Sequence, residues 1–241
     1  MYLLEAQNLT KKFGGLVAIK NLSFYVKPRE ILGIIGPNGA GKTTIFNIIS
    51  GFIKPDEGEI IFKGERITNL RPYAITRKGI ARTFQLTSSF PNMTVLENIL
   101  VALLNKREKP KSLLEKQAEE ILKRFDLFHK KDQKASALSH GDLKKLEIAR
   151  AIATRPELLL LDELFAGLSY EDVLALESVL KRLNSEGITI IMIEHIMKII
   201  MKLVTRVIVI CQGEKIAEGS PQEIAQDKRV IEAYLGGEAI S

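Results

Sequence analysis

Apolar and polar residues alternate differently along this chain of 241 residues, and the differences predict where strands and helices lie. Leu22 to Val26 alternates apolar and polar side chains, as a half-buried strand does. Ile31 to Ile35 is apolar apart from one glycine, which is typical of a central strand buried on both faces. Ile60 to Phe62 precedes a turn and predicts another strand. We therefore expect the first part of the chain to consist largely of short strands.

The middle of the chain has a helical pattern instead. Between Thr94 and Ala153 no segment has the period of a strand. Apolar residues recur at helical spacing from Leu113 to Phe125, with lysines and glutamates between them. This pattern is typical of an amphipathic helix that packs on one side. We expect a helical region here.

Strands return in the last third of the chain. Leu158 to Leu161, Ile188 to Ile193 and Arg206 to Cys211 are apolar runs, and a helix is predicted from about Tyr170 to Asn184. Strands that alternate with helices predict right-handed crossovers and a parallel sheet covered on both faces. We therefore predict an α/β fold, with residues 1–85 and 156–241 forming the core and residues 86–155 an inserted helical subdomain.

Composition and charge limit the classes of function that this chain is expected to have. The net charge of +6 is mild, and lysines and arginines between Lys106 and Lys145 mix with glutamates without interleaved aromatic residues. This favours a solvated helical face, and we expect no nucleic-acid partner. No apolar run approaches the ~18 residues that span a bilayer, and Met1 to Glu5 lack the basic start of a signal peptide. Any role at a membrane would then depend on a partner.

A glycine-rich segment carries the strongest chemical signal. Residues 36–43 read Gly-Pro-Asn-Gly-Ala-Gly-Lys-Thr and match the phosphate-loop pattern G-x-x-x-x-G-K-[ST], between a predicted strand and a predicted helix. Glycines let backbone N–H groups curl around phosphate oxygens, and a helix start adds its positive end. Lys42 suits the β- and γ-phosphates of a nucleotide, and the Thr43 hydroxyl suits Mg²⁺.

Two carboxylates follow the strand at Leu158 to Leu161. Ligands of open α/β sheets bind at the carboxyl ends of strands, so Asp162 and Glu163 are expected near the phosphate loop. Asp162 suits the Mg²⁺ shell. Glu163 suits orienting or deprotonating an attacking water.

A third element lies about twenty residues before Asp162. Leu138 is followed by Ser139, His140, Gly141 and Asp142, ahead of a predicted helix. Taken alone, this segment is a helix cap with an anion-binding end.

In their order along the chain, these elements resemble the ABC transporter ATPases over essentially the whole sequence. The resemblance implies a RecA-like core with a mainly parallel sheet, an antiparallel β subdomain and the helical insertion. It assigns Gln85 to Mg²⁺ and to signalling, and His195 to the γ-phosphate, so Glu163, His195 and Gln85 become the catalytic set and Thr43, Gln85 and Asp162 the metal set. The residues expected to hold ATP are Phe13, Gly36, Pro37, Asn38, Gly39, Ala40, Gly41, Lys42, Thr43, Thr44, Ser139, His140, Gly141 and Asp162. For Phe13 two interpretations stay open: it stacks on adenine, or it packs as an apolar side chain on the edge of the sheet.

Within this family, four segments resemble the ATPase subunits of branched-chain amino-acid importers. They are Ala81 to Gln85, Met93 to Asn98, Leu146 to Arg150 and Ile231 to Gly236. The resemblance implies permease subunits, an external binding protein that acts through the permease, and a peripheral position on the cytoplasmic face of the membrane. A second ATPase subunit, identical or related, would face this one head to tail.

Three positions depart from the family pattern: Asp142 stands where glutamine is usual, Leu164 where proline follows the glutamate, and Ser169 where Asp or Asn is favoured. Asp142 is expected to weaken nucleotide binding in trans. The alternatives left open are an exporter ATPase, such as that of lipopolysaccharide export, and a soluble ABC protein of DNA repair or translation. A regulatory nucleotide-binding protein would lack Glu163.

Overall fold

The N-terminal part of the protein is an antiparallel sheet. The structure, a computed structural model, describes residues 1–83, 89–104 and 110–235. The strands of this sheet are β1 (Leu4–Phe13), β2 (Leu16–Val26), β4 (Glu57–Phe62) and β5 (Glu65–Arg66). Their order is β2-β1-β4-β5, and all pairs are antiparallel. β1 and β2 are 10 and 11 residues long, so the expectation of short strands was wrong for them; shifts in their register interrupt the pairing without ending it.

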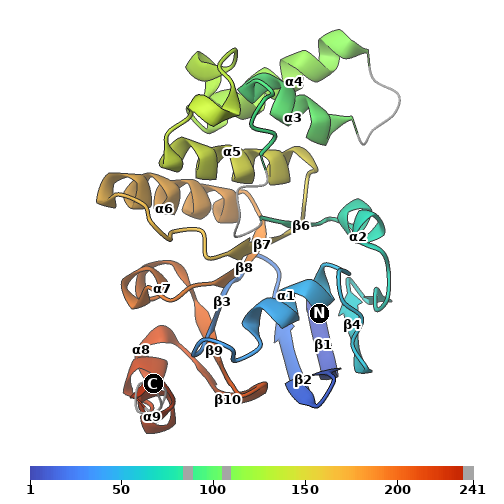
Figure 1. Ribbon diagram of the computed structural model, residues 1–241, viewed down its shortest axis with the longest axis vertical. Helices are drawn as coiled ribbons and strands as arrows, with labels where there is room; N and C mark the ends of the chain where they lie inside the picture. Colours follow the sequence, from blue (N-terminus) through green and yellow to red (C-terminus); the bar gives the residue numbers. More distant parts are fainter. Residues whose placement is uncertain (84–88, 105–109, 236–241) are drawn as a thin grey trace.

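A second sheet forms the centre of the molecule (Figure 1). Its strands are β3 (Ile31–Ile35), β6 (Ile80–Arg82), β7 (Leu158–Asp162), β8 (Thr189–Ile193), β9 (Arg206–Cys211) and β10 (Glu214–Gly219). The order is β10-β9-β3-β8-β7-β6, and neighbours are parallel except β9 and β10. The expected α/β class with a mainly parallel sheet is confirmed.

Helices lie around this sheet and form a separate layer beside it (Figure 1). They are α1 (Lys42–Ile49), α2 (Pro72–Lys78), α3 (Val95–Leu103), α4 (Lys111–Arg124), η1 (Phe128–Lys130), η2 (Ala135–Ala137), α5 (His140–Ala153), α6 (Tyr170–Ser185), α7 (Met197–Leu203), α8 (Pro221–Gln226) and α9 (Lys228–Leu235). From Thr94 to Ala153 the described residues contain helices and one isolated β-bridge, from Thr94 to Lys134. This agrees with the helical pattern of the sequence.

The central strands are buried on both faces, and alternate residues belong to different cores. Leu159 and Leu161 of β7 pack in the core shared with α3 to α7, whereas Leu158 and Leu160 pack in the core shared with α1 and the antiparallel sheet. All four have no exposed surface. The continuous apolar run of β7 is thus explained by two cores on opposite faces of one strand.

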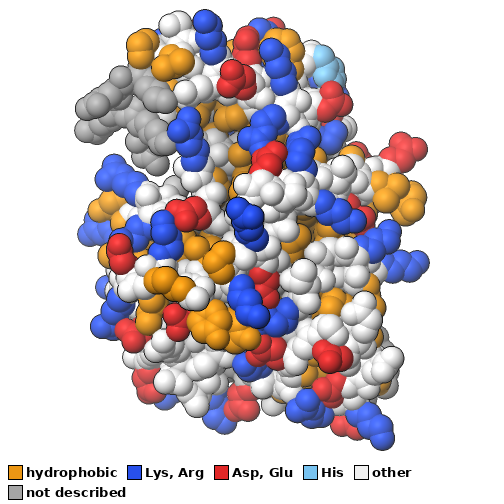
Figure 2. Space-filling model, turned by 180° about the vertical axis from the view of Figure 1, so that it is seen from behind, with side chains coloured by type: hydrophobic (Ala, Val, Ile, Leu, Met, Phe, Trp, Pro, Cys, Tyr) orange, Lys and Arg blue, Asp and Glu red, His pale blue; other side chains and the backbone are white. Residues whose placement is uncertain are grey.

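Charged side chains of both signs are interspersed on the face shown in Figure 2. In the helical layer, Lys131 of the loop after η1 pairs with Glu119 of α4 at 2.7 Å.

Within the described ranges, every helix is too short or too polar to cross a bilayer.

Candidate nucleotide-binding and hydrolysis site

The strand order brings the phosphate loop, the Asp162–Glu163 pair and His195 to one edge of the central sheet. β3, β8 and β7 are adjacent and parallel, so the loops that follow them emerge together. Asp162 pairs in register with Ile193, and the backbone N–H of Glu163 donates to the Ile193 carbonyl at 3.0 Å. The phosphate loop follows β3 at the same edge. Residues more than a hundred positions apart therefore surround one site.

Two glycines of the phosphate loop are required by close backbone contacts. A Cβ at Gly36 would lie 1.9 Å from the carbonyl oxygen of Ile210, and one at Gly41 would lie 2.4 Å from that of Ala18. Gly41 also has a φ of 102°, which side chains of L-residues disfavour. The loop can thus pack tightly between β2 and β9 and still turn its backbone toward a ligand.

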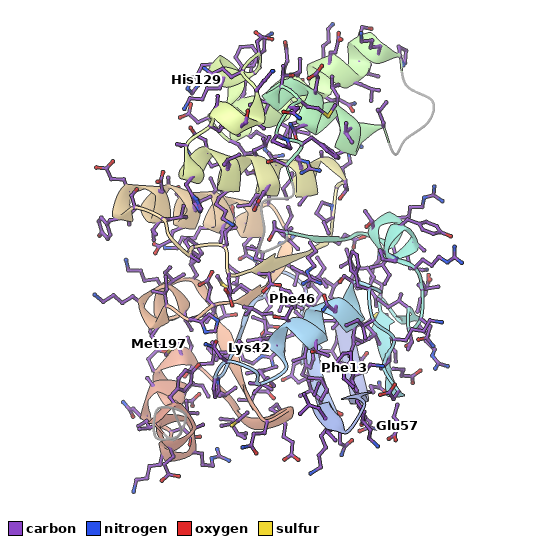
Figure 3. The ribbon with its side chains drawn as sticks, in the orientation of Figure 1. Phe13, Lys42, Phe46, Glu57, His129 and Met197 are labelled. Atoms are coloured by element: carbon purple, nitrogen blue, oxygen red, sulfur yellow. The ribbon has the colours of Figure 1, made fainter. Side chains whose placement is uncertain are left out.

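Lys42 begins α1 and is almost fully buried, with 6% of its surface exposed. Its ammonium group donates to the carbonyl oxygens of Gly36 and Pro37, both at 2.7 Å. Burial lowers the pKa of Lys42, and the charges of Glu163 and Asp162 raise it only in part. Figure 3 shows Lys42 at the start of the helix that continues to Phe46. A phosphate group would offer this ammonium stronger acceptors than the loop carbonyls.

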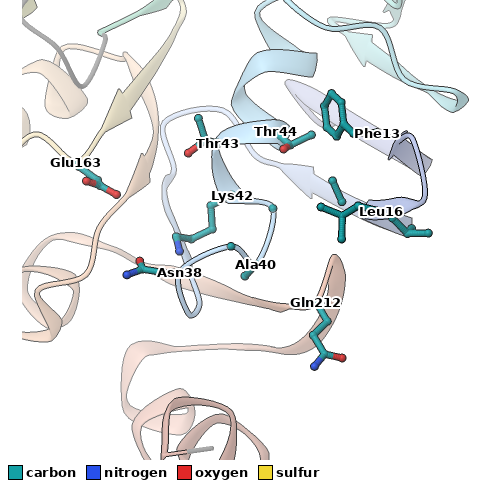
Figure 4. A pocket seen from close by; sticks show the side chains of 13 residues that line it. Phe13, Leu16, Asn38, Ala40, Lys42, Thr43, Thr44, Glu163 and Gln212 are labelled. Atoms are coloured by element: carbon teal, nitrogen blue, oxygen red, sulfur yellow. The ribbon is translucent and has the colours of Figure 1, made fainter. Parts of the chain in front are cut away.

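The phosphate loop opens on a cavity of about 570 Å³. Figure 4 shows Phe13 and Leu16 on one side of the loop and Glu163 on the other. The sequence had indicated Phe13, which is 45% exposed at the end of β1, but not Leu16 or Gln212. The apolar side of the cavity suits a planar base, and the loop side suits its phosphates. The described residues that line it are Phe13, Leu16, Val17, Ala18, Asn38, Gly39, Ala40, Gly41, Lys42, Thr43, Thr44, Glu163 and Gln212.

Asp162 has a buried partner that the sequence had not singled out. Arg82 of β6 donates to Asp162 Oδ2 at 2.9 Å, to Asn47 Oδ1 at 2.7 Å and to Ser50 Oγ at 3.0 Å. Burial raises the pKa of Asp162, against the hydrogen bond and the charge of Arg82, which lower it. Arg82 thus links α1 to the end of β7.

The oxygen donors at this edge fit a magnesium ion. Asp162 is 2% exposed, and its Oδ1 has no hydrogen-bond partner among the described residues. The hydroxyl of Thr43, one residue after Lys42, lines the cavity. A carboxylate and a hydroxyl are oxygen ligands of the kind that Mg²⁺ prefers. Gln85, the third predicted metal ligand, lies outside the described residues.

Glu163 and His195 form a pair across the ends of β7 and β8. Glu163 Oε1 lies 2.7 Å from His195 Nε2, and both side chains are partly exposed. Glu163 has a φ of 46°, a left-handed conformation that is uncommon for a residue with a side chain. This turn directs the carboxylate away from the sheet edge and into the cavity that Lys42 also lines.

The Ser139 segment lies elsewhere on the chain. Ser139 caps α5 by accepting the N–H of Asp142 at 3.2 Å, and Gly141 lies in the first turn of that helix. Ser139, His140 and Gly141 are not among the described residues that line the cavity. In one subunit, therefore, this helix start and the phosphate loop lie at separate positions.

Two departures from the family pattern have local explanations. Asp142 is 7% exposed and forms ion pairs with Lys130 and Lys145. Burial acts to raise its pKa, but hydrogen bonds from Lys130 and Ser139 and the two lysine charges outweigh burial and lower the pKa. Ser169 caps α6 by accepting the N–H of Asp172 at 3.2 Å, a role that Asp or Asn also fills.

Two family comparisons match most of the chain. Residues 19–166 match the family described as ABC transporter, and residues 214–240 match the family described as branched-chain amino acid ATP-binding cassette transporter. The chain is 40% identical to the high-affinity branched-chain amino acid transport ATP-binding protein LivG of Escherichia coli K12, over 97% of this chain and 98% of that protein. The similarity therefore extends from the phosphate loop to the C-terminal helices.

Solved structures share the fold over nearly the whole chain. An ATP-binding cassette of an ABC transporter in its ADP conformation superposes with a TM-score of 0.90 at 36% identity, covering 98% of this chain and 99% of that one. A dimeric structure of a bacterial ABC transporter cassette superposes with a TM-score of 0.81 at 30% identity, covering 90% of this chain and 98% of that one. Both agree with the two sheets and the helical layer described above.

Proposed function

Since this chain belongs to the ABC transporter family, we propose that it binds and hydrolyses ATP to power import of branched-chain amino acids through separate permease subunits. The hydrolysis part is carried by one observation: the 2.7 Å contact between Glu163 and His195 at the edge that also carries Lys42. The cargo rests on the similarity to LivG and on the match of residues 214–240.

In the proposed hydrolysis step, Glu163 orients a water molecule toward the γ-phosphorus. One water proton passes to the Glu163 carboxylate as the water oxygen bonds to phosphorus, and the bond from phosphorus to the β–γ bridging oxygen breaks with its electrons leaving on ADP. Lys42 binds the phosphate oxygens. His195 holds the carboxylate in orientation through its 2.7 Å contact with Glu163. By family resemblance, His195 also contacts the γ-phosphate.

The buried Oδ1 of Asp162 and the hydroxyl of Thr43 would hold Mg²⁺, with Gln85 as a further ligand by family resemblance. When bound, Mg²⁺ neutralises part of the charge on the β- and γ-phosphates. Arg82 binds the other oxygen of Asp162 at 2.9 Å and so leaves Oδ1 without a hydrogen-bond partner among the described residues.

A second ATPase subunit, of the same or a related chain, would complete the site. Ser139, His140 and Gly141 do not reach the cavity of their own subunit, so we assign them to the ATP of the partner, in a head-to-tail dimer. The family has dimeric cassettes among its solved members. We assign residues 1–85 and 156–241 to the nucleotide-binding core with its β subdomain, and residues 86–155 to the helical subdomain.

The proposed complex lies on the cytoplasmic face of the membrane, where this subunit binds the permeases peripherally. An external binding protein would select the amino acid and deliver it to the permeases. The ATPase subunit itself then needs no amino-acid site.

Reconstitution in proteoliposomes tests this proposal. We expect ATP-dependent uptake of labelled leucine when permeases and a leucine-loaded binding protein are present, and no uptake with Glu163→Gln. Uptake of an unrelated solute, or outward transport as in lipopolysaccharide export, would refute the cargo and leave the ATPase assignment intact. Failure of the wild-type complex to hydrolyse ATP would refute the ATPase assignment.

A further inference from the structure

A buried acid lies directly before His195. Glu194 follows β8 and is 2% exposed. Its Oε1 accepts the backbone N–H of Phe165 at 3.1 Å. The backbone N–H groups of His195 and Leu164 also lower the pKa of this carboxylate. Glu194, which directly precedes His195, is thus bonded to the backbone of the loop that carries Glu163.

These contacts control where the pair lies. Leu164 and Phe165 directly follow Glu163, so holding their N–H groups fixes the turn that carries the Glu163 side chain. Glu194 directly precedes His195, so the bond from the Phe165 N–H also connects the His195 loop to the Glu163 loop. Beyond these contacts, the two loops are joined by the bond from Glu163 N–H to the Ile193 carbonyl at 3.0 Å and by the side-chain contact itself.

The departure at Leu164 gives Glu194 an additional task. The family usually has proline at this position, and proline has no N–H group. Leu164 is 1% exposed and brings an N–H that needs an acceptor. An unpaired N–H in a buried position is unfavourable. The Leu164 N–H acts on the Glu194 carboxylate and lowers its pKa.

Packing alone does not account for an acid at this position. Burial raises the pKa of Glu194 to about 7, although backbone hydrogen bonds from Phe165, His195 and Leu164 lower it and the charge of Glu163 raises it further. A leucine would fill a similar volume without the cost of burying a carboxyl group. What leucine lacks is an acceptor for the two loops.

We propose that Glu194 is a positioning residue for ATP hydrolysis: by accepting the backbone N–H of Phe165, it ties the loop that carries His195 to the loop that carries Glu163 and holds both side chains in the geometry that hydrolysis requires. Among the described residues, no hydrogen bond joins Glu194 to the phosphate loop, so we expect it to act through the two loops it connects. The inference rests on the proposed role of Glu163.

The test measures steady-state ATP hydrolysis by the full chain with Glu194→Leu and Glu194→Gln. For Glu194→Leu we expect kcat to fall by ~10-fold or more, because small displacements of catalytic groups are costly. We expect KM for ATP to change by less than ~2-fold, because Lys42 and its loop keep their contacts. Glu194→Gln keeps an oxygen acceptor, so it should retain kcat within ~3-fold of the wild type.

Glu177→Gln is the matched control. Glu177 is also a buried acid, 6% exposed, but it lies on α6 and faces Lys202 at 3.9 Å. This variant should leave kcat unchanged. A melting temperature for each variant separates loss of fold from loss of positioning.

Wild-type kcat in a folded Glu194→Leu variant would overturn the inference, as would a loss of kcat in Glu194→Gln equal to that in Glu194→Leu. If Glu163→Gln abolishes hydrolysis while Glu194→Leu does not, the inference fails and the proposed function stands. If Glu163→Gln hydrolyses ATP at the wild-type rate, the proposed role of Glu163 fails as well.

Discussion

Glu163 Oε1 and His195 Nε2 lie 2.7 Å apart, although 32 residues separate them along the chain. The contact exists because β7 and β8 are parallel neighbours, with Asp162 in register with Ile193. The residues that follow these two partners therefore leave the sheet side by side.

The first prediction concerns Glu163 itself. Glu163→Gln should keep ATP affinity but lower kcat by at least ~10²-fold, because the amide cannot accept the proton of the attacking water. Nucleotide binding by titration calorimetry and phosphate release measure the two effects. Glu171→Gln, an exposed acid in the first turn of α6, is the control. Unchanged phosphate release in Glu163→Gln would contradict the assignment.

The second prediction concerns action in trans. Ser139→Arg should abolish ATP-driven dimerisation while the single chain still binds ATP, because Ser139 lies outside its own cavity. Sedimentation in the Glu163→Gln background, beside nucleotide affinity, measures both. Ser136→Arg, an exposed serine in η2, is the control. Loss of ATP binding to the monomer would show that Ser139 acts in cis.

The third prediction concerns the charge of Asp142. Lys130→Met removes one of the two lysines that pair with Asp142 and leaves a less compensated acid in the first turn of α5. We expect ATP-driven dimerisation to weaken by about 3- to 10-fold through repulsion of the partner's phosphate. Asp142→Asn in the same background should restore it. Lys131→Met, which breaks the pair with Glu119 and the contact with the Phe128 ring but leaves both partners of Asp142 in place, should have no effect on dimerisation.

The fourth prediction concerns the buried pair of Arg82 and Asp162. Arg82→Met should lower the free energy of unfolding by about 3–5 kcal/mol, because it leaves Asp162 buried without its ionic partner. Adding Asp162→Asn should recover part of that loss. Urea denaturation measures the change, and equal stability of Arg82→Met and the wild type would show that the pair contributes nothing.

The fifth prediction concerns pH. The pKa of Glu194 is about 7 in the folded protein, against an ordinary value of 4.5. The folded state thus binds the proton of Glu194 more tightly than the unfolded state. Protonated Glu194 therefore makes its full contribution to the free energy of unfolding below pH 4.5, and this contribution is lost as the pH rises through 7. Relative to Glu194→Gln, the free energy of unfolding of the wild type should fall by about 3 kcal/mol over this pH range. Urea denaturation of both proteins at pH 4.5, 6 and 8 measures the difference; parallel curves would contradict it.

Local sequence determined the pieces of the site. The phosphate loop was predictable because Gly36 to Thr43 forms its binding surface from consecutive backbone groups, whose geometry depends on neighbouring residues. The position of Asp162 and Glu163 at the end of a buried strand was also predictable from neighbouring residues, because the apolar run before them indicates burial. The helix predicted from Tyr170 to Asn184 was observed as Tyr170–Ser185 for the same reason.

Only the tertiary structure decided which pieces meet. Arg82 reaches Asp162 across 80 residues, and Glu194 accepts the N–H of Phe165 across 29. Both contacts depend on the order β3-β8-β7-β6, which hydrophobic periodicity does not encode, because any order that buries these strands satisfies the same pattern. Whether a buried charge is tolerated depends on its partners, and the strand order determines which partners are near. The contacts of Arg82 and Glu194 could therefore be identified only from the tertiary structure.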